Sequence, residues 1–345
     1  MSTRQLRVLI VASEYPLCSE TYIEVERRFL DNHGVTHVVA RNRVRRGKTP
    51  EHGSHLAKPS RWQMGRMLRQ FRPDVVHGQF LHMAEWTARI ARRAGVPWTL
   101  RTHSFDVLVR PEAERRRAAA LANGSDCLGI LGFPFARPIL ERLGLEPDKF
   151  VEAPPVADVN RFRSDGPTGE GILHFGAITA GKLAACAEFA RLSTMVPELA
   201  FHDYPTGFGS GRELAPRVQA VVRQEGGRVE THDWVPHSEM PRVFGEHRWF
   251  VYPGPAAQTF GWPVGVVEAW AAGVGVCIQR IRPDIDEYVD GAAVVFDDIE
   301  ELRSVLREEP DPGMVARGRE RAETMDISCH GQRLLDVWRA AALSV

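Results

Sequence analysis

The chain has 345 residues, with 44 Lys and Arg against 44 Asp and Glu, and 43% of its residues are hydrophobic. This composition is typical of a globular protein and excludes a disordered, collagen-like or small disulfide-stabilised chain. The five cysteines form no C-x-x-C pair, so we expect neither a zinc ribbon nor a disulfide framework, and a reducing cytosol is the expected compartment. No apolar run approaches the ~20 residues that cross a bilayer.

The neutral total conceals two halves of opposite charge. Residues 1–160 contain 25 Lys and Arg against 17 Asp and Glu, a net charge of +8, whereas residues 161–345 contain 19 against 27, a net charge of −8. The basic residues of the first half gather in segments 41–48, 61–72, 89–93 and 115–117, with Trp62, Met64 and Met67 interleaved. This pattern favours contact with anionic lipid headgroups, and solvated helix faces are the alternative. Nucleic acid is not expected as a partner, because no reader motif accompanies the charge.

Short apolar runs alternate with amphipathic stretches of helical period, which is typical of β-α-β units around a parallel sheet. In the first half we expect strands at 6–12, 35–40, 75–77, 98–102, 127–131 and 150–153. We expect helices at 21–32, 62–71, 84–94, 112–122 and 135–143. Residues 154–171, rich in Pro, Gly, Asp and Asn, are predicted to form a linker.

The alternation starts again after this linker. Strands are expected at 172–175, 199–202, 229–231, 249–252, 275–278 and 293–296, with helices between them. The pattern predicts two doubly wound parallel-sheet domains that face each other across a cleft, with ligands at the carboxyl ends of the strands. We expect an N-terminal acceptor-binding domain over 1–160, a C-terminal donor-binding domain over 161–326, and a closing helix over 327–345 that packs back toward the N-terminal domain.

Eight segments occur in an order known from one enzyme family. They are EYPLCSETYIEVERRFL, PDVVHGQF, GVPWTLRTHSFDV, PPVADVNRF, FGAITAGK, HDWVPHSEMPRVF, TFGWPVGVVEAWAAGVGVC and IRPDIDEYVDGAAVVF. Together they resemble the retaining GT-B glycosyltransferases of family 4, and the first segment is similar to members that read SETFI there. The resemblance covers almost the whole chain. It implies the α/β GT-B fold, made of two Rossmann-like domains.

The resemblance also implies an activity. It is the transfer of a hexose-type sugar from a nucleotide-diphosphate sugar, UDP- or GDP-linked, to a glycan or lipid-linked acceptor with retention of configuration. No metal and no other cofactor are expected. The implied location is cytoplasmic, peripheral at the inner face of the cytoplasmic membrane.

Lys182 is the leading candidate for holding the donor diphosphate. It follows a predicted strand and a glycine-containing turn and begins a predicted helix, so a phosphate there would meet an ammonium group and a helix N-terminus together. It is also the only lysine in residues 161–345. The resemblance places Gly176 beside it and puts Glu268 at the ribose hydroxyls, for which an acceptor-only carboxylate is suited. The alternatives are a solvated lysine at a helix start and an ordinary helix carboxylate.

The loop before Glu268 departs from the family pattern. The resemblance assigns Gln258, Thr259, Phe260 and Gly261 to the donor sugar, but Gln258 stands where the family has glutamate. Ala177 stands where the family has arginine. A catalytically degenerate nucleotide-binding protein therefore stays an alternative, as does a GT-B sugar-nucleotide 2-epimerase. A double-Rossmann dehydrogenase is disfavoured, because no G-x-G-x-x-G follows either first strand.

His103 is the catalytic candidate of the first half. It ends a predicted strand and matches a family histidine near the transferred sugar, where an imidazole can donate or accept a proton. The alternative is an ordinary hydrogen-bonded loop histidine. Asp106 is expected to orient His103 or to cap the next segment. His77 is predicted to be structural, since Gln79 replaces the second histidine of the family's H-x-H pair.

The resemblance assigns a second group of residues to the acceptor. It places Ser19, Glu20, Thr21 and Asp106 on the acceptor side. The spacing of Thr21 and Glu24 predicts a capping box at the start of a helix.

Overall fold

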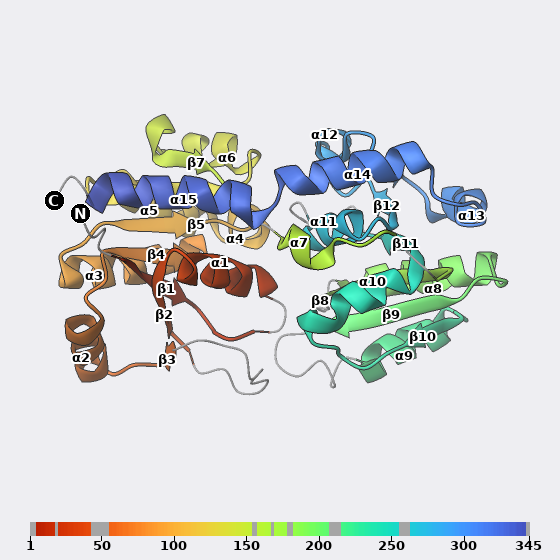
Figure 1. Ribbon diagram of the computed structural model, residues 1–345, viewed down its shortest axis with the longest axis horizontal. Helices are drawn as coiled ribbons and strands as arrows, with labels where there is room; N and C mark the ends of the chain where they lie inside the picture. The colour runs from red at the N-terminus through yellow and green to blue at the C-terminus, as the bar shows by residue number, and fades with distance from the viewer. Residues whose placement is uncertain are drawn as a thin grey trace. The chain divides into compact units, whose positions relative to one another are not determined.

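The computed structural model describes residues 5–17, 20–42, 55–153, 157–166, 169–177, 182–206, 215–254 and 263–342. The chain forms two compact units: unit 1 consists of Met1–Val156 with Ile327–Val345, and unit 2 of Ala157–Asp326. In each unit, helices pack on a parallel sheet (Figure 1). Among the described helices, none is both long and apolar enough to cross a membrane.

The sheet of unit 1 has the strand order β3-β2-β1-β4-β5-β6-β7, and every neighbouring pair is parallel. The strands are β1 (Leu6–Ala12), β2 (Gly34–Ala40), β3 (His55–Ala57), β4 (Val75–Gln79), β5 (Trp98–Arg101), β6 (Cys127–Gly132) and β7 (Phe150–Glu152). Strands β4 and β5 are buried at every position because helices cover both faces of such a sheet. The sequence did not predict β3, which is a short, half-buried edge strand without a periodic signal.

The helices of unit 1 include one from the far end of the chain. They are α1 (Thr21–Asp31), α2 (Arg61–Phe71), η1 (Leu81–Met83), α3 (Ala84–Ala94), α4 (Ser104–Leu108), α5 (Glu112–Ala122), α6 (Ala136–Arg142), η2 (Pro147–Lys149) and α15 (Ile327–Ala342). In α15 the indole of Trp338 is buried and donates to Thr99 Oγ1 at 3.0 Å. Gly331 of the same helix lies so close to Phe29 of α1 that an added Cβ would be 2.3 Å from the ring. These contacts hold α15 against unit 1.

The predicted capping box at the start of α1 is wrong. Glu20 is the N-cap residue, and its side chain makes no capping hydrogen bond. Glu24 turns instead toward Arg27, whose Nη2 lies 2.7 Å from Glu24 Oε1. An arginine one turn along the helix thus competes successfully with the backbone N–H for this carboxylate. A capping box is present at α2, between Ser60 and Gln63.

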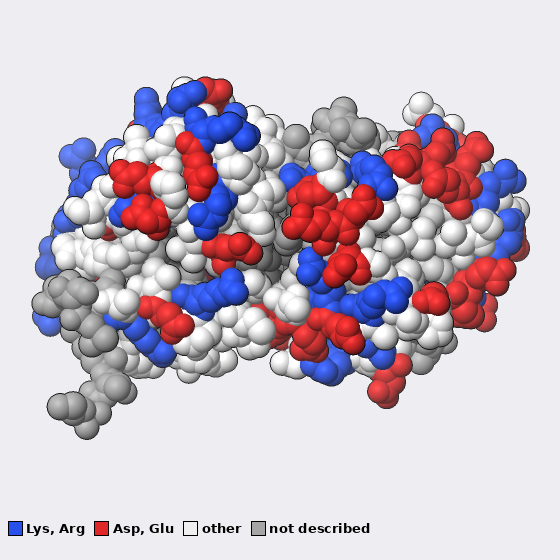
Figure 2. Space-filling model, turned by 90° about the horizontal axis from the view of Figure 1, so that it is seen from above, with Lys and Arg blue, Asp and Glu red and all other residues white. Residues whose placement is uncertain are grey.

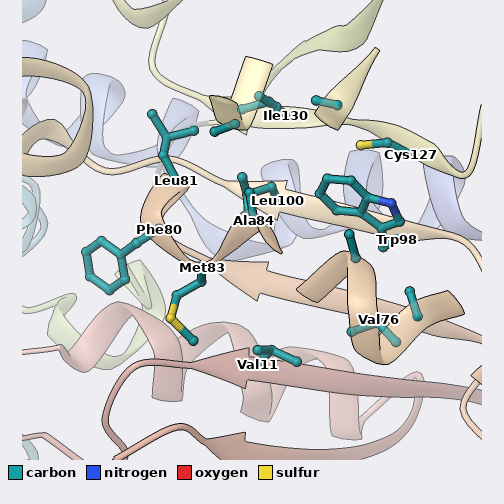
Figure 3. Packing of buried hydrophobic residues seen from close by; sticks show 14 of the residues in the cluster. Val11, Val76, Phe80, Leu81, Met83, Ala84, Trp98, Leu100, Cys127 and Ile130 are labelled. Carbon is teal, nitrogen blue, oxygen red and sulfur yellow. The ribbon is translucent and has the colours of Figure 1, made fainter. Parts of the chain in front are cut away.

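The core of unit 1 is closely packed on the strands that carry its functional candidates. Figure 3 shows buried side chains of β4, β5 and β6 meeting those of η1 and the start of α3. Ala84, Ala88 and Ala91 of α3 are fully or almost fully buried. Their small side chains bring the helix close to Trp98, the large first residue of β5. This close packing holds the carboxyl ends of β4 and β5 in place.

The sheet of unit 2 has the order β10-β9-β8-β11-β12-β13, again with parallel pairs. Its strands are β8 (Gly171–Ala177), β9 (Phe201–Thr206), β10 (Val229–Thr231), β11 (His247–Tyr252), β12 (Gly275–Gln279) and β13 (Val294–Phe296). Its helices are α7 (Val159–Phe162), α8 (Leu183–Met195), α9 (Ala215–Gln224), η5 (His237–Glu239), α10 (Met240–Gly245), α11 (Val264–Ala271), α12 (Ile285–Val289), η6 (Ile299–Glu301), α13 (Leu302–Val305) and α14 (Pro312–Thr324).

Each sheet has one place where the direction of winding reverses. The chain of unit 1 builds β1, β2 and β3 outward and then returns to place β4 on the other side of β1. Unit 2 repeats this with β8, β9 and β10, followed by β11 beside β8. The carboxyl ends of the two strands at such a switch point diverge into separate loops, and ligands of α/β sheets bind there.

Candidate functional site

Lys182 lies at the switch point of unit 2. It directly precedes α8 in the segment that leaves the carboxyl end of β8, and β8 pairs with β11. Burial lowers the pKa of its ammonium group from 10.5 to about 8, although Cys186 one turn along the helix raises it. An anion placed beside this poorly hydrated cation would further favour its charged form. The position and the electrostatics both favour a phosphate ligand.

Glu268 lies on α11, which follows β11 at the same switch point. Its side chain is buried, with 3% of the residue exposed. His237 of η5 approaches it, with Nε2 only 2.7 Å from Glu268 Oε1. The imidazole is held in turn against Phe162 of α7, with 5.3 Å between the ring centroids. The contact with His237 therefore restrains the orientation of the carboxylate.

The carboxyl ends of β4 and β5 in unit 1 carry a buried polar network centred on Glu26 of α1. Arg101 donates from Nε to Glu26 Oε2 at 2.7 Å, and Gln79 donates from Nε2 to Oε1 at 3.2 Å. His77 Nε2 lies 2.9 Å from the same Oε1. Burial alone would raise the pKa of Glu26, but Arg101 and His77 lower it to about 2. Glu26 is therefore a buried carboxylate anion.

His103 is the outermost member of this network. Its Nε2 lies 3.0 Å from Gln79 Oε1. Because Gln79 uses its amide nitrogen for Glu26, the oxygen faces His103, so the imidazole carries its proton on Nε2. The ring packs between Tyr22 and Phe80, at centroid distances of 4.4 and 4.3 Å. Burial, with a contribution from Arg101, holds the pKa of His103 well below its usual value, so the imidazole is neutral.

Asp106 fixes the loop that carries His103. Its Oδ1 accepts from the backbone N–H of His103 at 2.7 Å, and its Oδ2 from that of Leu81 at 2.5 Å. The residue is fully buried, which raises the pKa of the carboxyl to about 7. Its oxygens are thus occupied by the protein itself. Asp106 was expected on the acceptor side. Its hydrogen bonds favour a positioning role instead, because they join the loop after β4 to the loop after β5.

The other acceptor-side candidates lie at the start of α1. Glu20 and Thr21 are partly buried, and burial together with Glu14 raises the pKa of Glu20 to about 8. A carboxyl with this pKa is largely protonated at neutral pH and can donate a hydrogen bond to a hydroxyl group. Ser19 lies outside the described residues.

The remaining donor-side candidates are mostly outside the described part of the chain. Gly176 is in β8, where an added Cβ would meet no atom within 4 Å, so its side-chain position faces open space. Gln258, Thr259, Phe260 and Gly261 fall in residues 255–262, which the structure does not describe.

Comparison with known proteins gave a family match within the first unit. Residues 4–155 match the family model described as glycosyl transferase 4-like domain. The match covers a little under half of the 345 residues. A search of curated proteins gave no match.

Solved structures similar over the whole chain extend this result to the fold. HepE of Anabaena in complex with UDP-glucose has a TM-score of 0.76 at 12% identity, over 97% of this chain and 100% of that chain. Sucrose-phosphate synthase of Thermosynechococcus elongatus has a TM-score of 0.68 at 14% identity, over 99% and 100%. A glycosyltransferase of Rickettsia africae has a TM-score of 0.71 at 12% identity, over 97% and 98%. These structures share the fold of this chain, so the predicted GT-B fold is confirmed.

Sequence reasoning missed Glu26, Arg101 and His237. Glu26 carried a readable signal, because it lies on the apolar face of α1, between the buried Ile23 and Leu30. A charged residue in that position needs a buried partner. His237 gave no such signal, since the segment after β10 has no periodic pattern that points it toward Glu268.

The contact between His237 and Glu268 makes a binding prediction. Replacing His237 with phenylalanine keeps a ring against Phe162 but removes the partner of Glu268. If Glu268 binds the ribose hydroxyls, the wild-type protein should prefer UDP over 2′-deoxy-UDP about tenfold, the value of one charged hydrogen bond. We expect H237F to lose most of that preference in calorimetric titration, and E268Q to behave likewise. An unchanged preference for UDP in both variants would show that Glu268 does not bind the ribose hydroxyls.

Proposed function

We propose that this protein is a glycosyltransferase that moves a hexose-type sugar from a nucleotide-diphosphate sugar, UDP- or GDP-linked, to a glycan or lipid-linked acceptor. The proposal includes retention of anomeric configuration and independence from a metal cofactor. The GT-B fold and the glycosyl transferase 4-like domain support the reaction class. The similar structure of HepE is a complex with UDP-glucose, which favours a uridine donor as the first probe.

The observation that carries the proposal is the poorly hydrated cation at the switch point of unit 2. In the reaction, the bond from the sugar's anomeric carbon to the diphosphate oxygen breaks, and the acceptor's hydroxyl oxygen forms the new bond to that carbon. The proton of the acceptor's hydroxyl group leaves with the nucleoside diphosphate, on which negative charge grows. Lys182 and the N–H groups that open α8 would stabilise that charge without reorganising.

The other residues take the roles that the family resemblance implies. Glu268, fixed by His237, would bind the ribose hydroxyls, and residues 258–261 with Gly176 would line the sugar. His103, neutral with its proton on Nε2, would assist at the reacting centre, with Gln79 and Asp106 as positioning residues. Ser19, Glu20 and Thr21 would contact the acceptor.

A thermal-shift panel of UDP, GDP, ADP and dTDP sugars tests the donor. A ligand at 100 times its dissociation constant adds about 2.7 kcal/mol to the free energy of unfolding, so one nucleotide should stand out. Transfer to an acceptor, or slow hydrolysis of that donor, would then establish catalysis. Binding without either reaction would favour the catalytically degenerate alternative, which the replacements at Gln258 and Ala177 motivate. The absence of any shift would contradict nucleotide-sugar binding altogether.

We also propose that α2 brings the protein to an anionic membrane, at the inner face of the cytoplasmic membrane. Its inner side buries Met64, Met67 and Leu68, so these methionines belong to the core rather than to the surface. Its outer side exposes four arginines and a tryptophan, namely Arg61, Trp62, Arg66, Arg69 and Arg72. The exposed fraction of Trp62 is 65%, a high value for so large an apolar ring.

Basic residues of a neighbouring helix extend this surface. Gly65 leaves room for Arg93 of α3, whose Nη2 would lie 2.6 Å from an added Cβ, with Arg69 beside it. On the face seen in Figure 2, Lys and Arg line much of the outer edge of unit 1 and the larger Asp and Glu clusters lie on unit 2, while both signs of charge occur on each unit. The opposite net charges of the two halves are thus partly visible on this face.

Vesicle cosedimentation tests this membrane surface. Because each basic residue near an anionic membrane contributes ~1 kcal/mol, reversing Arg66 and Arg69 to glutamate should weaken binding to phosphatidylglycerol vesicles at least about tenfold. The matched control reverses Arg217 and Arg303, two exposed arginines of unit 2, and should leave binding much less changed. Equal binding by the two double variants would refute a role for α2.

A further inference from the structure

Three side chains that commonly bind metals meet at the edge of the sheet of unit 2. β10 is the edge strand and pairs with β9, with Glu230 directly opposite His202. His232 follows β10 two residues after Glu230. Since alternate residues of a strand share a face, these three side chains lie on the same side of the sheet.

The distances between their ligand atoms suit a single small cation. His202 Nδ1 lies 2.9 Å from His232 Nε2, and each of these nitrogens lies 3.8 Å from a carboxylate oxygen of Glu230. Ligands bound tetrahedrally to Zn²⁺ at about 2.0–2.1 Å are separated from one another by roughly 3.3 Å. The observed distances lie on both sides of that value, so shifts of a few tenths of an ångström suffice. Glu230 is 68% exposed and can make such a shift.

The two imidazoles are held in place by packing. The ring of His232 stacks on Tyr204, with centroids 4.2 Å apart and an angle of 6° between the planes. The ring of His202 meets His247 of β11 edge-on at 4.9 Å, across β8. Gly171 of β8 makes this possible, because a Cβ there would lie 2.7 Å from His247 and 3.2 Å from His202. Rigid ligands of this kind lose little entropy when an ion binds.

The residue types select the class of ion. Two imidazole nitrogens and one carboxylate are the ligands that Zn²⁺ takes in many proteins, and they leave one coordination position for water. Ca²⁺ requires six to eight oxygen ligands, which this set does not supply. Without a metal, the two histidines share one N–H···N contact, and Glu230, at 3.8 Å from both nitrogens, is beyond hydrogen-bond distance of either.

We propose that His202, Glu230 and His232 bind one divalent transition-metal ion, with Zn²⁺ as the best fit. The ion joins β9 to the three-residue strand β10 and so stabilises the edge of the sheet. The site is distinct from the donor site, because His202 is near the amino end of β9 whereas Lys182 follows the carboxyl end of β8. The proposed sugar transfer therefore does not pass through this ion, whose effect is to stabilise the sheet edge.

Calorimetric titration with ZnCl₂ tests the site in the full chain, freed of any polyhistidine tag and treated with a chelator. We expect one equivalent to bind and to raise the melting temperature. H232A and E230Q should each weaken binding at least about tenfold, the scale of effect seen when a metal site loses a supporting group. H33A, which removes an exposed histidine from unit 1, is the matched control and should bind as the wild type does.

E230Q keeps the test decisive if H232A fails to fold, since it changes only an exposed side chain. The proposal would be overturned if both variants kept wild-type zinc binding. Zinc would then bind elsewhere, for instance at the buried group of His174, Cys186 and Asp203. The absence of saturable Zn²⁺ binding by the wild-type protein would overturn it as well.

Discussion

Replacing Lys182 with alanine is expected to reduce turnover by a factor on the order of 10²–10³, the usual cost of removing one preorganised group that stabilises transition-state charge. The loss should appear mainly in kcat, because the charge on the diphosphate grows as the bond to the sugar breaks. Steady-state transfer assays with the donor found by thermal shift measure it. K58A, which removes an exposed lysine of unit 1, is the control and should react as the wild type does. Wild-type turnover in K182A would disprove the assignment.

The lowered pKa of Lys182 adds a second readout that does not depend on catalysis. With a pKa of about 8 in the free protein, the side chain is charged at lower pH and loses its proton above that value. A bound diphosphate favours the charged form, so UDP affinity should be constant below pH 8 and fall about tenfold per pH unit above it. K182R stays charged, and its affinity should not fall in this range. Parallel titrations between pH 7.5 and 9 distinguish the two curves.

Replacing Glu26 with alanine is expected to lower the free energy of unfolding by about 3–5 kcal/mol, because it leaves a buried guanidinium without its carboxylate. Arg101 is only 2% exposed and has no route to water without moving. Urea unfolding measures the loss. E112A is the control, since Glu112 forms an exposed helix pair with Arg116 that should contribute less than about 1 kcal/mol. Equal losses in E26A and E112A would show that the buried network is not a stability determinant.

The same carboxylate predicts an acid dependence. The pKa of Glu26 is about 2 in the folded protein and near 4.5 when unpaired. A group whose pKa is lowered by folding contributes its full stability above the unfolded value and loses it as the pH falls toward the folded value. The stability difference between the wild type and E26Q should therefore be constant above pH 4.5 and shrink toward pH 2. A difference that is unchanged by acid would contradict the ionised state of Glu26.

The amino-acid sequence predicted most strands of both sheets to within one or two residues. A strand that is buried on both faces needs apolar residues along its own length. A short window of the sequence is enough to show such a run, and the run recurs at each strand. Strand β9 shows where local information ends: the expected strand 199–202 begins instead at Phe201 and continues to Thr206, because these residues pair with β8 through Ala177. The partner strand, and not the apolar run, sets the length.

The buried network of unit 1 shows the same limit at a functional position. Glu26, Gln79, Arg101 and His103 come from α1, β4, β5 and the loop after β5, so no sequence window contains them together. The protonation of His103 depends on the amide of Gln79, whose orientation depends on Glu26. A family pattern identified the histidine, but only the packing of α1 on the sheet decides which nitrogen carries its proton.

The sequence by itself determined the two-unit α/β organisation, the position of Lys182 at the start of a helix and the opposite charges of the two halves. These features follow from composition and period, which are read along the chain. The tertiary structure decided the partner of Glu268, the anion beside Arg101 and the meeting of His202 with Glu230 and His232. Those contacts depend on which strands and helices lie side by side. This arrangement is set by the packing of the whole unit, because both faces of its sheet must be buried.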